Sequence, residues 1–228
     1  MDEPKLTTIY LVRHGESEAN LRADKGEQFS HVQEYGEEGA PLTENGKNQT
    51  KELAKKMQQV HFDAFYSSDL VRARETAEAV ALERKLAVQT TNLIRERSFF
   101  EYLNHHRNKK REQVEEEMRE ELSKLNEIGK FQYKHTPDME SAEEGAVRLI
   151  TFLREIALAH RGQTILVANH GNLIRNILTH LGWATFDELA GTKNVENTGY
   201  VVLESDGVDF FIKETSGIQK SFGQRRVW

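Results

Sequence analysis

The chain has 228 residues, of which 37% are hydrophobic and 8% aromatic, enough for one domain with a sizeable core. Its formal net charge is −6, and this acidic balance argues against a protein that binds the phosphate backbone of nucleic acids. There are no cysteines, which excludes disulfides, thiolate metal sites and a cysteine nucleophile. No signal-peptide pattern and no run of about 18 apolar residues occurs, so we expect a soluble cytoplasmic protein without a membrane span.

The first half of the chain predicts strands followed by helices. Residues 8–12 (TIYLV) form a short apolar, β-rich run that indicates a buried strand. Residues 21–41 are polar and predict a long loop. Thr43 is a suitable N-cap for a helix over about 44–59. A strand is expected at 64–66, and a helix over about 69–83 follows it, with N-cap candidates in Ser67, Ser68 and Asp69.

The second half continues this alternation. We expect a strand near 87–91, an amphipathic helix over about 112–128, and a helix from 142 to about 160. Ser141 and Glu144 have the spacing of a capping box at the start of that last helix. A buried strand at 164–168 leads into a helix that Gly182 can end. Two further strands, 200–204 and 210–214, flank a hairpin turn. The alternation predicts an α/β domain with a largely parallel sheet and helices on both faces.

Two of the predicted strands end in the same dipeptide. Arg13-His14-Gly15 follows the first strand, and His170-Gly171 follows the strand at 164–168. In open α/β sheets ligands bind beyond the carboxyl ends of the strands, so both histidines are expected at one site. Each precedes a glycine and leads toward a helix, whose first amide groups favour an anion.

Arg72 adds a second arginine at the same predicted edge. It lies in the first turn of a helix, where the helix dipole disfavours a cation unless an anion is bound there. A simple i,i+3 pair with Glu75 is the alternative explanation. Two arginines and two imidazoles together suit phosphoryl transfer, which depends on positioning and charge stabilisation.

Six blocks of the sequence, in this order, resemble the motifs of the histidine phosphatase superfamily, also called phosphoglycerate mutase-like. They are residues 11–17 (LVRHGES) with Asn20, 41–46 (PLTENG), 66–77 (YSSDLVRARETA), 93–97 (LIRER), 139–141 (MES) and 170–171 (HG). The resemblance implies a three-layer α/β/α fold with a mostly parallel central sheet. It further implies one domain over 1–228, in which residues 97–139 form a helical cap over the site.

The resemblance also implies roles for individual residues. His14 would attack phosphorus and become phosphohistidine, while Arg13, Arg72 and His170 would bind the phosphoryl oxygens. Glu96 would protonate the leaving oxygen and then activate water. Further substrate contacts are expected from Asn20, Arg22 and Gly171. No cofactor and no metal are expected, and the nine histidines show no regular metal-ligand spacing.

Three positions leave the assignment open. Glu101 lies close to Glu96 and is the competing candidate for the acid. Asn169 stands where the family often has a small hydroxyl residue, and Met139 replaces a glycine.

The segment over 97–139 bears on the substrate. It is shorter than its equivalent in cofactor-dependent phosphoglycerate mutases, which favours a phosphatase of small phosphorylated metabolites. A mutase, and a member that acts on or binds proteins, remain the alternatives. A basic cluster, Arg107, Lys109, Lys110 and Arg111, is either a second anion site or a solvated turn. The edge hairpin leaves a homodimer open, whereas nucleic acid and membrane partners are not expected.

Overall fold

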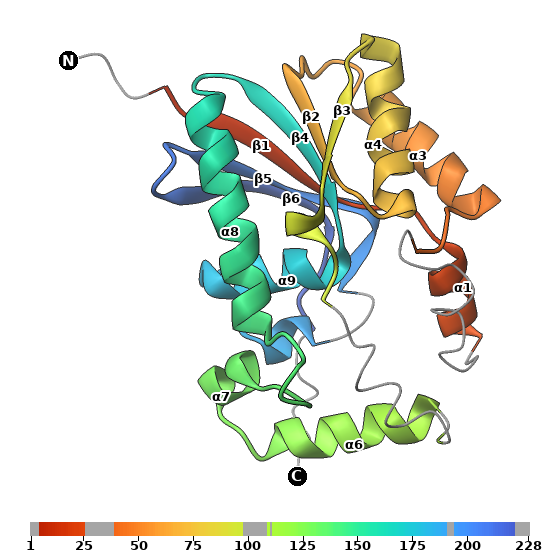
Figure 1. The fold of residues 1–228 in the computed structure, drawn as a ribbon, viewed down its shortest axis with the longest axis vertical. Helices are drawn as coiled ribbons and strands as arrows, with labels where there is room; N and C mark the ends of the chain where they lie inside the picture. Colours follow the sequence, from red (N-terminus) through yellow and green to blue (C-terminus); the bar gives the residue numbers. More distant parts are fainter. Residues whose placement is uncertain (1–4, 26–38, 98–108, 110, 191–193, 222–228) are drawn as a thin grey trace.

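The computed structural model describes residues 5–25, 39–97, 109, 111–190 and 194–221, and its centre is a mixed sheet (Figure 1). The strands of this sheet are β1 (Thr7–Arg13), β2 (Ala64–Ser68), β3 (Val88–Thr91), β4 (Thr164–Asn169), β5 (Val195–Ser205) and β6 (Phe210–Ile218). Their order is β3-β2-β4-β1-β5-β6. The first four are mutually parallel, whereas β5 runs antiparallel to both β1 and β6.

Helices cover both faces of the sheet, and each face has its own apolar core. The α-helices are α1 (Glu18–Asp24), α3 (Glu44–Lys56), α4 (Val71–Ala81), α6 (Arg111–Ser123), α7 (Glu127–Gln132), α8 (Ala142–Ala159) and α9 (Gly171–His180). Ile165 and Val167 of β4 face the core formed with α8 and α9. Leu166 and Ala168 face the core formed with α3 and α4. The alternation of side chains along a strand explains this division and confirms the three-layer prediction.

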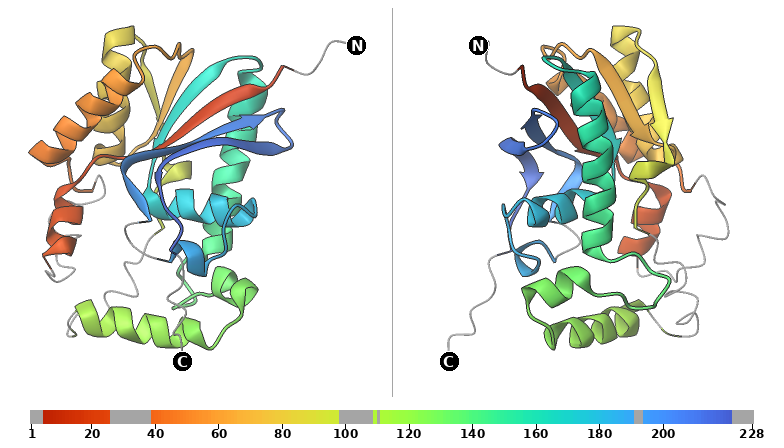
Figure 2. Two further views of the ribbon diagram at one scale, coloured as in Figure 1. Left: turned by 180° about the vertical axis from the view of Figure 1, so that it is seen from behind. Right: turned by 60° about the vertical axis from the view of Figure 1, so that its left-hand side comes forward.

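The expected helical segment before α8 is present as two helices. Figure 2 shows α6 and α7 lying beyond the lower ends of the strands, apart from the sheet. Val114 of α6 is buried against Met139, and Met118 packs beside them. The amphipathic spacing predicted one helix over 112–128, but α6 ends at Ser123 and Asn126 caps a new helix. The packing of Val114 and Met118 confirms that the stripe covers an apolar contact, whereas the prediction of one long helix was wrong.

Two other sequence predictions need correction. Residues 21–24 were predicted as loop but belong to α1, because the Ser17 side chain caps its first turn and Asn20 completes a capping box. The rest of that predicted loop, 26–38, lies outside the described residues. The N-cap of α4 is Leu70, without a side-chain cap. Ser67 and Ser68 cannot serve, because both are buried in strand β2.

The capping box that starts α8 and the hairpin are confirmed. Ser141 and Glu144 each bond the other's backbone amide. Strands β5 and β6 flank a turn that Gly207 makes with a φ of 96°. No helix in the described ranges is both long enough and apolar enough to cross a bilayer.

Candidate active site

His14 lies one residue beyond β1 and is 4% exposed. Its Nδ1 lies 2.7 Å from the carbonyl oxygen of Gly15, and its Nε2 lies 3.1 Å from Nε of Arg72. A carbonyl only accepts and a guanidinium only donates, so these two contacts define the tautomer. Nδ1 carries the hydrogen, and the lone pair of Nε2 points toward Arg72.

The environment keeps this imidazole neutral. Burial, followed by the charges of Arg72 and Arg13, lowers the pKa of His14 well below its ordinary value. A neutral ring with an unprotonated Nε2 is the form required of a nucleophile. The histidine therefore has the correct protonation state for attack before any substrate arrives.

His170 follows β4 and lies beside His14, with ring centroids 5.2 Å apart. It is fully buried, and neither ring nitrogen has a hydrogen-bond partner among the described residues. Burial first, and then the charge of Arg72, lowers the pKa of His170 well below its usual range. A buried donor without a protein partner is costly, and an anionic oxygen between the two rings would satisfy it. The preceding Asn169 is also buried, and its backbone oxygen accepts from the amide of His14 at 3.0 Å.

Arg13 packs directly over Gly171. A Cβ atom on Gly171 would lie 3.2 Å from Nε of Arg13, so a side chain there would crowd the guanidinium. One end of the guanidinium donates to the carbonyl oxygen of Val195, whereas Nε is buried without a partner in the described chain. Arg13 is thus anchored at one end, and its Nε–H remains available to an anion at the start of α9.

Arg72 projects from the first turn of α4 toward His14. Burial lowers its pKa to about 10, which leaves it charged at neutral pH. The alternative explanation was an ion pair between Arg72 and Glu75. The Glu75 carboxylate instead accepts the amide of Leu42 at 2.9 Å. The orientation of Arg72 toward His14 supports the anion-binding interpretation.

Asn20 on α1 reaches the same region. Its Oδ1 accepts from the amide and the hydroxyl of Ser17, at 3.2 Å and 3.1 Å, and from Nδ2 of Asn197 at 3.4 Å. These contacts leave its Nδ2 group to donate to a ligand. Arg22 lies in the last turn of the same helix and is half-buried.

Asn197 is a residue that the sequence analysis missed. Its Nδ2 also donates to the carbonyl oxygen of His14, at 3.2 Å, and so links His14 to Asn20. The next residue, Thr198, has a φ of 60°, an uncommon conformation for a β-branched side chain. The Asn-Thr-Gly sequence, typical of a backbone irregularity in a strand, is the signal that could have drawn attention to it.

Glu96 follows β3 in the chain, and its side chain contacts the first turn of α9. Its carboxylate oxygens accept from the amides of Arg97 at 3.0 Å and Asn172 at 3.1 Å. Its charge opposes the effect of burial on the pKa of Arg13 and of Arg72. Its competitor Glu101 lies outside the described residues.

Of the basic cluster, only the Lys109 side chain lies within the described residues. Lys109 is exposed and pairs with Glu117 at 2.6 Å. Arg107 and Lys110 lie outside the described residues, as does the side chain of Arg111. In the part of the chain that the structure describes, no three histidine or acidic side chains are grouped as metal ligands.

Three comparisons relate this geometry to known proteins. A family model described as the histidine phosphatase superfamily (branch 1) matches residues 9–216. The adenosylcobalamin/alpha-ribazole phosphatase of Escherichia coli K12 is 27% identical over 174 residues, 76% of this chain and 78% of that protein. The 2,3-bisphosphoglycerate-dependent phosphoglycerate mutase of Bartonella tribocorum is 28% identical over 193 residues, 80% of this chain and 84% of that protein. The structure of Bacillus stearothermophilus YhfR matches with a TM-score of 0.69 and 25% identity, covering 90% of this chain and 95% of that chain.

Proposed function

This chain belongs to the histidine phosphatase superfamily, and we propose that it is a metal-independent phosphatase that hydrolyses small phosphate monoesters through a phosphohistidine at His14. The family match and the named relatives establish the coarser statement, an enzyme of phosphatase or mutase type. The observation that carries the finer proposal is the buried, neutral His14, whose Nε2 lone pair faces a guanidinium.

The proposed reaction has two steps. Nε2 of His14 attacks phosphorus, the bond from phosphorus to the ester oxygen breaks, and Glu96 gives its proton to that oxygen. Water then attacks the phosphohistidine, Glu96 takes the proton of that water, and the bond from phosphorus to Nε2 breaks. Arg13, Arg72 and His170 stabilise the phosphoryl oxygens in both steps, because preorganised cations and donors stabilise the charge of phosphoryl transfer.

The substrate proposed is a small phosphorylated metabolite. One relative is named as an adenosylcobalamin/alpha-ribazole phosphatase, and the net charge of −6 disfavours a nucleic acid. Asn20, Arg22 and Gly171 are the proposed further contacts of the substrate. We propose that residues 97–139 form a cap within a single domain, since α6 and α7 lie beyond the strand ends (Figure 1). A cytoplasmic location and a homodimer through β6 remain predictions.

A mutase is the second candidate, because several relatives bear that name. A mutase returns the phosphoryl group to another hydroxyl and needs a bisphosphate to prime it, whereas a phosphatase transfers it to water. Turnover of 3-phosphoglycerate that requires added 2,3-bisphosphoglycerate would favour the mutase. Phosphate release without such a primer would favour the phosphatase.

The direct test is hydrolysis of p-nitrophenyl phosphate with a chelator present. The wild-type chain is expected to turn over, and His14→Ala is expected to lose at least about 10³-fold in kcat/KM because the nucleophile is gone. His61→Ala is the matched control, since that side chain is 89% exposed. Activity that the chelator abolishes, or that survives in His14→Ala, would contradict the proposal.

A further inference from the structure

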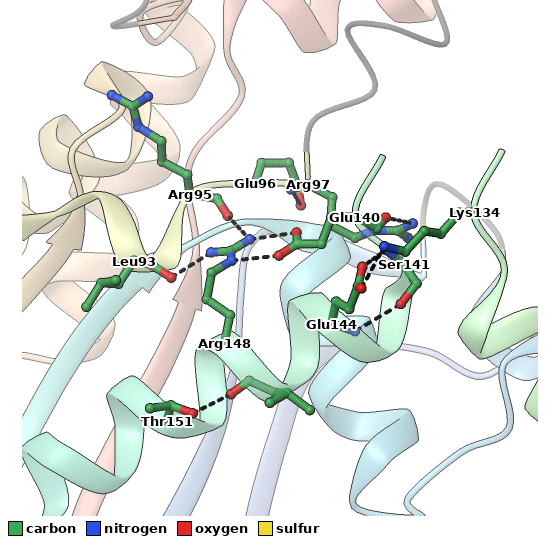
Figure 3. Close-up of polar contacts among 11 residues, drawn as sticks. Leu93, Arg95, Glu96, Arg97, Lys134, Glu140, Ser141, Glu144, Arg148 and Thr151 are labelled. Carbon is green, nitrogen blue, oxygen red and sulfur yellow. Dashed lines mark hydrogen bonds and ion pairs between the residues drawn. The ribbon is translucent and has the colours of Figure 1, made fainter. Parts of the chain in front are cut away.

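All three guanidinium nitrogens of Arg148, in α8, donate hydrogen bonds (Figure 3). Its Nε and Nη2 donate to the two carboxylate oxygens of Glu140 at 2.7 Å and 2.8 Å. Its Nη1 donates to the carbonyl oxygen of Leu93 at 2.6 Å, and Nη2 also donates to that of Arg95 at 3.0 Å. One side chain therefore joins the start of α8 to the segment before Glu96.

Glu140 holds the same segment from the other side of Glu96. Its backbone oxygen accepts from Nε of Arg97 at 3.2 Å and from Nη2 at 2.7 Å. Arg148 and Glu140 thus fix the residues immediately before and immediately after Glu96. Glu96 therefore lies between two attached residues, Arg95 and Arg97, and both attachments involve the ion pair of Arg148 with Glu140.

Both attachment points rest on a rigid part of the fold. Glu140 directly precedes Ser141, the N-cap of α8. The neighbouring Leu149 and Leu153 are fully buried in the core against the sheet. Arg148 and Glu140 therefore link α8 to the segment that carries Glu96.

We propose that Arg148, paired with Glu140, is a positioning residue that sets the place of the Glu96 carboxyl group relative to the leaving oxygen. This inference rests on the role of Glu96 in the proposed function. A lysine could not replace Arg148, because only the planar guanidinium offers donors for a carboxylate fork and two carbonyls at once.

The test compares two substrates of nearly the same shape, p-nitrophenyl phosphate and phenyl phosphate. Phenolate is the poorer leaving group and depends more on protonation by an acid. The readout is the ratio of kcat/KM for the nitrophenyl ester to that for the phenyl ester. It is measured in wild type, Glu96→Gln, Arg148→Met and the double variant. Arg154→Met, an exposed arginine of the same helix, is the control.

Glu96→Gln is expected to raise the ratio by about 10²-fold, the usual effect of a lost general acid. Arg148→Met is expected to raise it on the order of 10-fold, because a small displacement of the acid costs rate. In the Glu96→Gln background, Arg148→Met should leave the ratio unchanged. Arg154→Met should match wild type.

A merely structural role for Arg148 predicts that both substrates slow by the same factor, and an unchanged ratio would overturn the inference. If Arg148→Met does not fold, Arg148→Lys is measured by the same readout, and an unchanged ratio there has the same meaning. If Glu96→Gln itself leaves the ratio unchanged, the acid role in the proposed function fails, and the inference fails with it. If Glu96→Gln changes the ratio and Arg148→Met does not, the inference about Arg148 is rejected and the proposed function stands.

Discussion

At the scale of single residues, the tautomer of His14 is the feature on which the proposed chemistry depends. Nδ1 donates to the carbonyl oxygen of Gly15, and Nε2 accepts from Arg72. Both contacts act on the same ring, so the protonation state and the orientation of His14 are determined together.

This arrangement predicts the titration of His14 in the free protein. By ¹⁵N NMR, the Nδ1–H tautomer should persist as the pH falls through about 6.5, the ordinary pKa of histidine. Arg72→Met should move the pKa of His14 upward, because a neighbouring positive charge is removed. Arg74→Met, which changes a half-exposed arginine near Glu78, is the control. An Nε2–H tautomer, or a midpoint that Arg72→Met leaves unchanged, would contradict the assignment.

The sequence predicted the two histidines and Arg72 of this site but not the residues that hold them in place. His14 and His170 were identified because each directly follows a buried strand, and Arg72 because it opens a helix at the same edge. Asn197 escaped notice, since its contact with His14 spans 183 residues of sequence. Local patterns record strand ends and helix starts, whereas a hydrogen bond across the sheet depends on strand order.

At the scale of elements, the first turn of α3 packs against the backbone that follows His14. A Cβ atom on Gly46 would lie 2.0 Å from the carbonyl oxygen of Glu16. That same oxygen accepts the amide of Thr43 at 3.0 Å. The glycine is therefore required by backbone-to-backbone contact.

Gly46→Ala is expected to destabilise the protein by about 1–3 kcal/mol, because backbone must move to admit the methyl group. It should also reduce kcat/KM, because Glu16 lies two residues from His14. Urea unfolding and turnover check both effects. Asn48→Ala, on the exposed side of the same helix, should stay within about 0.5 kcal/mol of wild type. An equally small change for Gly46→Ala would show that α3 adapts without cost.

Element boundaries were predicted best where a local signal was strong. The capping box of α8 and the apolar run of β4 each determine their element within a few residues. Helix α1 was missed, because its sequence is polar and no residue of it is buried. Without an apolar stripe, a short helix resembles a loop, and only its cap at Ser17 distinguishes it.

At the scale of the whole molecule, strand order brings the site together. Strands β1 and β4 are adjacent and parallel, and Arg13 pairs with Asn169 in their register. His14 and His170 therefore leave the sheet side by side. The sequence predicted that both histidines lie at one edge, but it could not predict that their strands are neighbours, because that depends on the whole topology.

Two buried neutral histidines also make the stability of the fold depend on pH. Burial is the largest cause that lowers the pKa of both His14 and His170 in the folded chain. In the unfolded chain each should titrate near its ordinary value of about 6.5. Below that pH the unfolded state binds more protons than the folded state, so stability must fall as the pH decreases. Above that pH neither state binds these protons, and the contribution is constant.

The expected slope is about 1.4 kcal/mol per pH unit for each histidine, between about pH 6.5 and its folded-state pKa. Urea unfolding at pH 7.5, 6.5 and 5.5 measures it above the range in which carboxylates titrate. His14→Gln and His170→Gln should each flatten the decline, because each removes one proton-binding difference between the two states. His61→Gln, whose side chain is exposed, should leave the decline as steep as in wild type. If all four proteins lose stability equally between pH 6.5 and 5.5, the two site histidines are not held neutral by the fold, and the proposal that His14 is a neutral nucleophile loses its main support.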